Sequence, residues 1–149
     1  MAGSGTAHLR ERDATLLRAE NLVVEFPVGS TGLKVHAVSD VSLDVRHGET
    51  LGLVGESGCG KSTTGKALMQ LPRPTSGEVL LEGRDLTKLK GNALREVRPQ
   101  MQMIFQDPIS SLNPRRTIRD IVAEPLKIWG RGTSAEQDRI VNETLEAVG

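Results

Sequence analysis

The sequence is short of cysteine, aromatic residues and long apolar runs. Its 149 residues include one cysteine, two phenylalanines, one tryptophan and no tyrosine. The single Cys59 excludes an internal disulfide and favours a reducing compartment. No segment approaches the roughly 20 apolar residues of a membrane-spanning helix, and the N-terminus lacks the apolar stretch of a secretory signal. We therefore expect a cytoplasmic protein whose core is built from Val, Leu and Ile, which suits α/β sheets buried on both faces.

An excess of charge of either sign is also missing, because 19 Lys and Arg balance 19 Asp and Glu. A net charge of zero creates no overall field that attracts nucleic acid or an anionic membrane. Residues 1–16 mix Gly, Ser, Thr and charged residues without periodicity. We predict that they form a disordered leader.

Hydrophobic patterning from residue 17 onward predicts alternating strands and helices. Strands are expected at 22–26, 35–45 (a half-buried pair), 50–54, 78–82 and 101–105. Helices are expected at 64–71, from Ile118 to about Trp129, and from Ser134 onward. Pro125 should kink or break the second of these helices. Ser134 to Gln137 has the pattern of a capping box for the third.

A glycine-rich loop joins the predicted strand at 50–54 to the first predicted helix. Gly55 to Thr63 reads Gly-Glu-Ser-Gly-Cys-Gly-Lys-Ser-Thr and fits G-x-x-x-x-G-K-[ST], the phosphate-loop pattern. Gly55, Gly58 and Gly60 let backbone N–H groups approach a phosphate closely. The N-terminus of the following helix adds partial positive charge. The sequence therefore predicts a nucleotide-phosphate site, against the alternative of an ordinary glycine-rich turn.

Side-chain chemistry is concentrated at the end of this loop. Lys61 is predicted to bind the β- and γ-phosphates, the Ser62 hydroxyl to bind Mg²⁺, and Thr63 to support the α- and β-phosphates. Cys59 is either a small filler or a thiol made reactive by the helix N-terminus. We assign nine residues to the nucleotide site: Gly55, Glu56, Ser57, Gly58, Cys59, Gly60, Lys61, Ser62 and Thr63.

Three further segments give the sequence a family resemblance. Gly77 to Leu86 reads Gly-Glu-Val-Leu-Leu-Glu-Gly-Arg-Asp-Leu, Met103 to Pro114 reads Met-Ile-Phe-Gln-Asp-Pro-Ile-Ser-Ser-Leu-Asn-Pro, and Ile121 to Leu126 reads Ile-Val-Ala-Glu-Pro-Leu. Together with the phosphate loop, these segments resemble the nucleotide-binding subunits of ABC transporters, and specifically those of oligopeptide and dipeptide importers. The resemblance spans residues 17–149.

The resemblance implies an α/β fold of the P-loop NTPase class, the ABC-type nucleotide-binding domain, of which we expect the N-terminal part. Residues 17–111 should form the ATP-binding core with its β-subdomain, and residues 112–149 the beginning of the helical subdomain. The signature Leu-Ser-Gly-Gly-Gln, a strand ending in Asp-Glu after residue 106 and the switch histidine do not occur. We therefore expect the chain to bind ATP without turnover and to expose apolar sheet edges.

The family's motifs also imply roles for two residues outside the loop. Gln106 matches the Q-loop glutamine, a γ-phosphate sensor that contacts Mg²⁺ or the attacking water and is expected, with Lys61, to serve catalysis. The alternative is a glutamine that only ends a strand. Phe26 matches an aromatic residue that stacks on adenine. A core position is the alternative for Phe26, and His36 is the nearest other candidate for stacking.

A basic cluster, Arg115, Arg116 and Arg119, lies in the segment that resembles the helical subdomain. In the family, that subdomain receives a short helix from the membrane subunit. The cluster is therefore either a solvated face, the usual role of such a cluster, or a docking contact.

The function implied by the resemblance is that of an ATP-binding subunit of a peptide importer, which in the full-length protein hydrolyses ATP to drive transport. Its cofactors would be ATP and Mg²⁺. Its partners would be a second ABC ATPase, expected to be a sister subunit, and transmembrane permease subunits at the inner face of the cell membrane. No nucleic-acid partner is expected. The alternatives are a non-transport ABC-type ATPase acting on nucleic acid or ribosomes and a small-molecule kinase, and the transported solute stays open.

Overall fold

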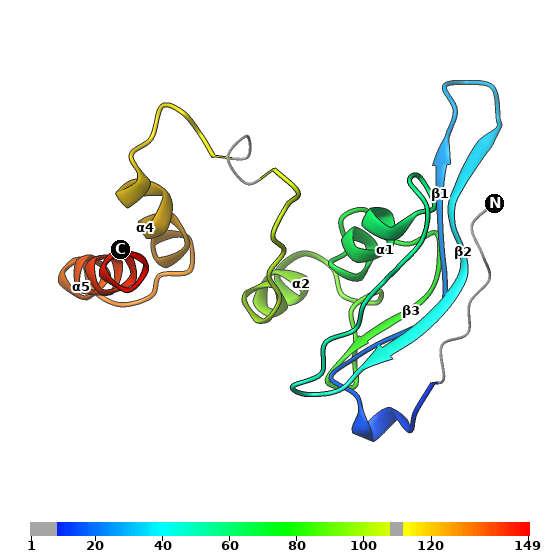
Figure 1. The fold of residues 1–149 in the computed structure, drawn as a ribbon, viewed down its shortest axis with the longest axis horizontal. Coiled ribbons are helices and arrows are strands. Elements are labelled where there is room, and N and C mark those ends of the chain that lie inside the picture. Colours follow the sequence, from blue (N-terminus) through cyan, green and yellow to red (C-terminus); the bar gives the residue numbers. More distant parts are fainter. Residues whose placement is uncertain (1–8, 108–111) are drawn as a thin grey trace. The chain divides into compact units, whose positions relative to one another are not determined.

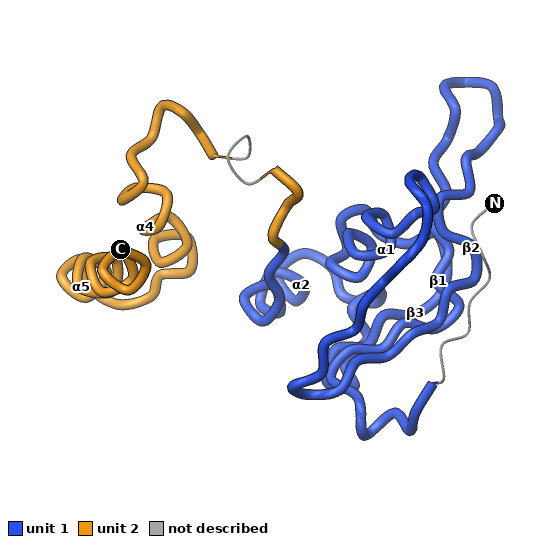
Figure 2. Tube along the Cα trace, in the orientation of Figure 1, with its two compact units in different colours: residues 1–103 blue, residues 104–149 orange. Residues whose placement is uncertain are grey.

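The computed structural model describes residues 9–107 and 112–149, which divide into two compact units at residues 103 and 104 (Figure 2). Among these residues, the first unit holds a sheet and two α-helices, and the second holds two α-helices (Figure 1). The elements of the first unit are η1 (Arg12–Ala14), β1 (Leu17–Pro27), β2 (Lys34–Val45), α1 (Lys61–Leu68), β3 (Ser76–Leu81), β4 (Arg84–Asp85), α2 (Gly91–Val97) and η2 (Arg98–Gln100).

The sheet has the strand order β2-β1-β3-β4, and every neighbouring pair is antiparallel. The predicted strand at 22–26 lies within the longer β1, and the strand predicted at 78–82 overlaps β3. Residues 35–45 were expected to form a strand pair, which is wrong, because they belong to the single strand β2. Short turns join β1 to β2 and β3 to β4, whereas β1 and β3 are paired across a longer segment that contains β2 and α1.

The core of the first unit lies between this sheet and α1. Apolar residues of β1, β2 and β3 meet Ala67 of α1, which is fully buried. The buried members are Ala19, Leu22, Val24, Val38, Leu43, Ala67, Val79, Leu81, Leu86 and Val97. Because α1 contacts both β1 and β2, the loop that precedes α1 is held beside the sheet.

Two of the predicted strands, at 50–54 and 101–105, are not strands in the structure. Val54 is 96% exposed and Ile104 is 91% exposed, whereas both were expected inside a buried sheet. A strand is stabilised by backbone hydrogen bonds to a neighbouring strand. Among the described residues neither segment has such a neighbour, so their apolar composition alone does not make them strands.

The segment before β1 is held beside the sheet by hydrogen bonds and ion pairs. Arg10 donates through its side chain to Glu49 and through its backbone N–H to Asp44, at 2.5 and 2.6 Å. Arg18 of β1 donates in turn to the Arg10 carbonyl oxygen at 2.5 Å. Residues 9–16 therefore make defined contacts, and residues 1–8 of the predicted leader lie outside the described residues.

The second unit contains α4 (Ile118–Ile128) and α5 (Ser134–Val148), which pack on one another around Ala123 and Val141. Pro125 was expected to kink or break this helix, and a break does not occur, since α4 continues through it. α5 has a capping box, but it is formed by Thr133 and Glu136, one residue before the predicted Ser134 to Gln137. Within the described ranges, no helix is both long and apolar enough to span a bilayer.

Candidate functional site

The phosphate loop approaches the sheet most closely at Gly60, which caps the N-terminus of α1. Gly60 has a φ of +96°, in the left-handed region that favours glycine. A Cβ atom added at Gly60 would collide with the carbonyl oxygen of Ala37 in β2. The backbone conformation and the close approach both require glycine at this position, so the loop is seated directly on β2.

The first turn of α1 presents backbone donors at the end of the loop. The first intrahelical bond runs from the Thr64 N–H to the Gly60 carbonyl, at 2.8 Å, and the Thr64 hydroxyl donates to the same oxygen at 3.0 Å. The N–H groups of Lys61, Ser62 and Thr63 precede that bond, so the helix itself does not satisfy them. The Ser62 side chain is exposed beside them. Such a turn binds anions through aligned amides and the helix dipole.

The Lys61 side chain folds back across the loop. Its ammonium donates to the carbonyl oxygens of Gly55, at 2.8 Å, and Glu56, at 2.6 Å. Its Nζ atom also lies 3.5 Å from the Cys59 sulfur. The positive charge that the sequence assigns to phosphate binding is therefore already placed between the two ends of the loop.

Cys59 fills space inside the loop. A turn closes from the Cys59 N–H to the Glu56 carbonyl, at 3.3 Å. A Cβ atom added at Gly55 would lie 2.7 Å from the Cys59 sulfur, so the thiol packs closely against Gly55. Cys59 is half-buried, which agrees with the interpretation of a small filler more than with that of an exposed reactive thiol.

A pocket of about 410 Å³ opens between the loop and the sheet. Its lining is largely apolar, and includes the unpaired segment 51–54. Its lining residues are Val41, Ser42, Leu43, Leu51, Gly52, Leu53, Val54, Gly55, Cys59, Lys61 and Thr64. An apolar lining of this kind cannot compensate the desolvation of a triphosphate. The first-turn amides of α1 therefore offer the better place for phosphate.

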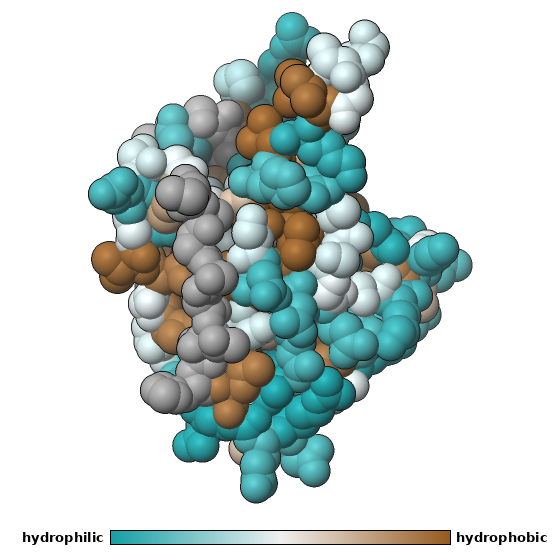
Figure 3. Space-filling view, turned by 90° about the vertical axis from the view of Figure 1, so that its right-hand side faces the viewer, coloured by the Kyte–Doolittle hydropathy of each residue, from teal (hydrophilic) through white to brown (hydrophobic). Residues whose placement is uncertain are grey.

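The β1–β2 hairpin extends the buried face of the sheet beyond the loop. Val24 is buried, and Phe26 lies on the same face two residues later along β1. Val35 pairs with Phe26 in the register, so its side chain shares that face. Val28 and Leu33, joined by a 2.9 Å backbone hydrogen bond, follow at the tip. The side chains of this face beyond Val24 are exposed, namely Phe26, Val28, Leu33 and Val35. Hydrophobic side chains gather where the hairpin ends, at the top of Figure 3.

The opposite face of the hairpin is charged. Glu25 accepts from Lys34 at 2.6 Å and lies 3.1 Å from His36. The hydrogen bond from Lys34 lowers the pKa of Glu25. His36 pairs with Glu25 in the register, so it lies on the face opposite Phe26. Of the two candidates for stacking on a base, Phe26 is the one on the side of the sheet against which the phosphate loop and α1 are packed.

Gln106 lies in the second unit, where it is exposed in a bend. Gln106 and the phosphate loop thus belong to different units, and the role of Gln106 toward phosphate stays a prediction. Part of the segment that carries the family resemblance, residues 108–111, lies outside the described residues. Two of the three clustered arginines form ion pairs in their own unit, Arg116 with Glu124 and Arg119 with Asp138.

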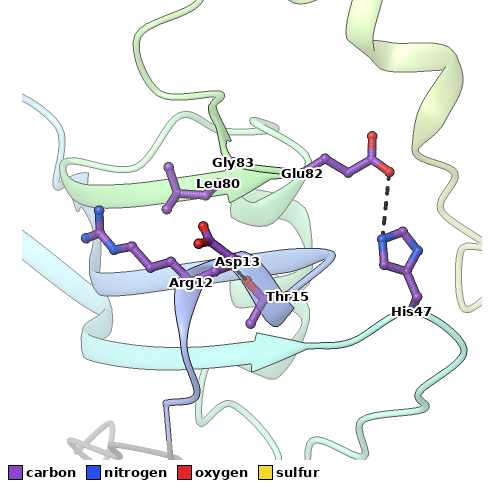
Figure 4. A pocket seen from close by; sticks show the side chains of 7 residues that line it. All are labelled: Arg12, Asp13, Thr15, His47, Leu80, Glu82 and Gly83. Carbon is purple, nitrogen blue, oxygen red and sulfur yellow. Dashed lines mark hydrogen bonds and ion pairs between the residues drawn. The ribbon is translucent and has the colours of Figure 1, made fainter.

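A second pocket, of about 450 Å³, contains none of the predicted site residues (Figure 4). It is lined by Arg12, Asp13, Thr15, His47, Leu80, Glu82 and Gly83. Its side chains carry both signs of charge, and His47 is 3.8 Å from Glu82 at its rim. Nothing in this arrangement selects one kind of ligand.

Two features of the site were not predicted from the sequence. One is the contact between Gly60 and Ala37, and the other is the set of apolar residues that share the face of Phe26. Val28, Leu33 and Val35 alternate with polar residues around a Gly-containing turn, and that alternation could have revealed one apolar hairpin face. The Ala37 contact had no such signal, because it depends on the local register of two strands.

A glycine loop that packs against a sheet and is followed by a helix whose first residue is lysine is typical of proteins of the P-loop class. The family model for ABC transporters matches residues 38–149, and the chain belongs to this family. The predicted fold class, an ABC-type nucleotide-binding domain, is thereby confirmed.

The curated relatives include proteins named for peptide transport. The chain is 44% identical over 142 residues to the oligopeptide transport ATP-binding protein AppF of Bacillus subtilis, covering 91% of this chain and 43% of AppF. It is 49% identical over 137 residues to the dipeptide transport ATP-binding protein DppF of Lactococcus lactis, covering 90% of this chain and 44% of DppF. The chain therefore spans less than half the length of these relatives.

Solved structures of similar fold include a bacterial ABC transporter cassette, MJ0796, in a dimeric structure, at a TM-score of 0.73 and 27% identity. A second structure of MJ0796, a dimer in a post-hydrolysis state bound to ADP and Pi, matches with a TM-score of 0.72. Each match covers 87% of this chain and 56% of the other. The similarity extends beyond the phosphate loop to most of the described fold.

Proposed function

We propose that the chain binds the triphosphate of Mg-ATP at the phosphate loop, Gly55 to Thr63. The observation that carries this proposal is the position of the Lys61 ammonium, held by two loop carbonyls and followed directly by the first-turn amides of α1. A γ- or β-phosphate oxygen would accept from both kinds of donor. Lys61 would then neutralise charge on the phosphates, which stabilises the transition state of phosphoryl transfer.

The donor set also fits a magnesium ion. Ser62 is exposed in the first turn of α1, beside the amides that would hold the phosphates, and a hydroxyl oxygen is a suitable ligand for this hard cation. We assign Gln106 as a further ligand, through its amide oxygen. When bound, Mg²⁺ would neutralise negative charge on the phosphates.

The apolar face of the hairpin is proposed to receive the adenine. Phe26 is 40% exposed and shares that face with Val35. An aromatic ring stacks on a base without requiring hydrogen bonds from it. In β2, Val35 is only two residues from Ala37, which contacts Gly60 of the phosphate loop. One nucleotide would therefore reach from the phosphate loop to the hairpin.

In the longer protein, we propose that this region belongs to the ATP-binding subunit of a peptide importer. AppF and DppF, which transport oligopeptides and dipeptides by name, support that substrate class, and the dimeric structures of MJ0796 support pairing with a second ATPase, expected to be a sister subunit. Permease subunits would hold the protein at the inner face of the membrane. Residues 17–111 would form the ATP-binding core and residues 112–149 the start of the helical subdomain.

Two measurements on a polypeptide of the relatives' length test this proposal. Gln106→Ala should keep Mg-ATP binding but lose hydrolysis and its coupling to transport, since Gln106 is assigned to Mg²⁺ and water rather than to the bulk of the phosphate contacts. The parent should co-purify with a membrane complex and should show no ATPase stimulation by nucleic acid. Stimulation by nucleic acid, without a membrane partner, would contradict the transport function.

A further inference from the structure

At one of the irregularities in the pairing of β1 with β2, strand β2 carries an extra residue, Ala37. Val24 pairs with Val38, and Glu25 pairs with His36, so Ala37 has no partner in the register. An extra residue of this kind forms a β-bulge, which bends the strand and raises its twist. The bulge lies where the buried part of β2, beginning at Val38, gives way to the exposed hairpin.

The bulge is also the point at which β2 meets the phosphate loop. The carbonyl oxygen of Ala37 faces the Cα of Gly60 so closely that no side chain fits between them. The Val38 side chain lies beneath the same glycine, with Cγ2 3.7 Å from the position of a Cβ atom. Because Gly60 caps α1 and Val38 is in the buried core, loop, helix and strand are fixed to one another at this contact.

The contact sets the geometry of two surfaces at once. Gly60, which meets Ala37, leads directly into Lys61 and the α1 amides, and two residues before Ala37 in β2 is Val35, which shares the hairpin face with Phe26. A bulge that changed its bend would move the hairpin face relative to the loop without altering either surface. The bulge at Ala37 therefore lies where the chain passes from one surface to the other, and it contacts Gly60.

We propose that Ala37 is a positioning residue, whose bulged backbone braces the hairpin against Gly60 and so aligns the base-binding face with the phosphate loop. This inference rests on the proposed nucleotide site and adds to it the means by which base and triphosphate are held together. The ligand class is a nucleoside triphosphate with a planar base. Ala37 itself contacts neither the base nor the reacting phosphate.

Deleting Ala37 tests the inference, because the deletion keeps the neighbouring pairs Val24–Val38 and Glu25–His36 in register while removing the bulge. Binding of ATP and of inorganic tripolyphosphate, each with Mg²⁺, is measured by titration on the 149-residue chain. The deletion should leave tripolyphosphate affinity within about twofold of the parent. The advantage of ATP over tripolyphosphate should fall about tenfold, the loss expected when a base no longer stacks.

Ala37→Ser is the matched control. It changes the half-buried side chain but keeps the bulged backbone and its carbonyl, so it should retain the parent's ratio of ATP to tripolyphosphate affinity. An unchanged ratio in the deletion variant would overturn the inference, and so would an equal loss of both ligands, which would mean that the bulge supports only the loop. A parent that binds neither ligand would contradict the proposed function itself.

Hydrogen exchange on the unmodified chain decides the question even if the deletion variant fails to fold. Tripolyphosphate has no base, so any direct contact would be limited to the phosphate loop and α1. If the loop braces the hairpin through Ala37, saturating tripolyphosphate should slow amide exchange at residues 34–38 at least about twofold. Protection confined to residues 55–64, in a chain that demonstrably binds the ligand, would overturn the inference.

Discussion

The Lys61 Nζ atom lies 2.8 Å from the carbonyl oxygen of Gly55, six residues earlier in the chain. The first and the last part of the phosphate loop are thereby joined by one ammonium group. A phosphate that enters the loop would take over these hydrogen bonds, because a charged acceptor forms stronger bonds with an ammonium than a carbonyl does. The loop and its lysine should therefore change together when nucleotide binds.

Cys59 offers a direct probe of the phosphate loop, since it is the chain's single cysteine and its sulfur lies 3.5 Å from Lys61 Nζ. We expect Mg-ATP to slow the reaction of Cys59 with a bulky thiol reagent at least about fivefold at saturation, because bound phosphates would cover the loop. The rate is measured by mass spectrometry of the labelled chain. In Lys61→Ala, ATP should give no protection. Equal labelling of the parent with and without ATP would place the nucleotide elsewhere.

The turn between β3 and β4 should be stabilised by Glu82→Asn. Glu82 and Gly83 form a two-residue loop with φ values of +48° and +75°, an arrangement that favours Asn-Gly. Relieving the strained glutamate should raise the free energy of unfolding by about 1 kcal/mol, measured by urea denaturation. Glu82→Gln is the control, since it also removes the charge near His47 but gains no preference for positive φ. If the free energy of unfolding rose equally in both variants, the gain would come from removing the charge and not from relieving backbone strain.

The ion pair of Arg10 with Glu49 should give the chain a specific acid sensitivity. The hydrogen bond from the Arg10 guanidinium, supported by the Arg46 N–H, lowers the pKa of Glu49 from 4.5 to about 2. Since the pKa is lower in the folded chain, the pair stabilises the fold above pH 4.5 and this contribution is lost as the pH falls toward 2.

Urea denaturation of the parent and of Glu49→Gln across pH 2 to 6 measures this contribution. The two proteins should differ most near pH 6 and converge near pH 2, and added salt should shrink the difference because the pair is accessible to solvent. A difference that stays constant with pH would mean that the ionisation of Glu49 does not contribute.

Thr133→Ala should weaken α5. The Thr133 hydroxyl accepts from the Glu136 N–H, and the Glu136 carboxylate accepts from the Thr133 N–H at 2.7 Å. Loss of such a cap lowers the free energy of unfolding by about 1 kcal/mol. Ser134→Ala is the matched control, since Ser134 is the first helical residue rather than the cap. Helical circular dichroism followed through urea denaturation measures both, and equal losses would contradict the assigned cap.

Local patterns in the sequence predicted the elements whose stabilisation is local. The helices α1 and α5 were expected from helix signals and capping residues that act within a few positions, although α1 spans Lys61–Leu68 and thus begins and ends three residues before the predicted 64–71. The exact cap was missed because Thr133–Glu136 and Ser134–Gln137 both fit the capping pattern. Only the backbone at Thr133, with φ −73° and ψ 167°, distinguishes them.

Features that depend on distant residues were not predictable in this way. The apolar segments at 50–54 and 101–105 have strand composition, but a strand requires a neighbour, and composition does not state whether one is present. The seat of Gly60 on Ala37 joins residues 23 positions apart. It arises from a bulge whose position follows from the pairing of two strands rather than from either strand alone.

The most direct test of the account is a calorimetric titration of Mg-ATP into the chain and into its Lys61→Ala and Lys66→Ala variants. Lys66 is an exposed lysine of the same helix, so it controls for the loss of positive charge. Saturable binding by the parent and by Lys66→Ala is expected, with binding to Lys61→Ala weaker by at least about tenfold, the effect of losing a hydrogen bond to a charged group. No saturable binding by the parent, or equal affinity in all three proteins, would contradict the assignment of Gly55 to Thr63 as the nucleotide site.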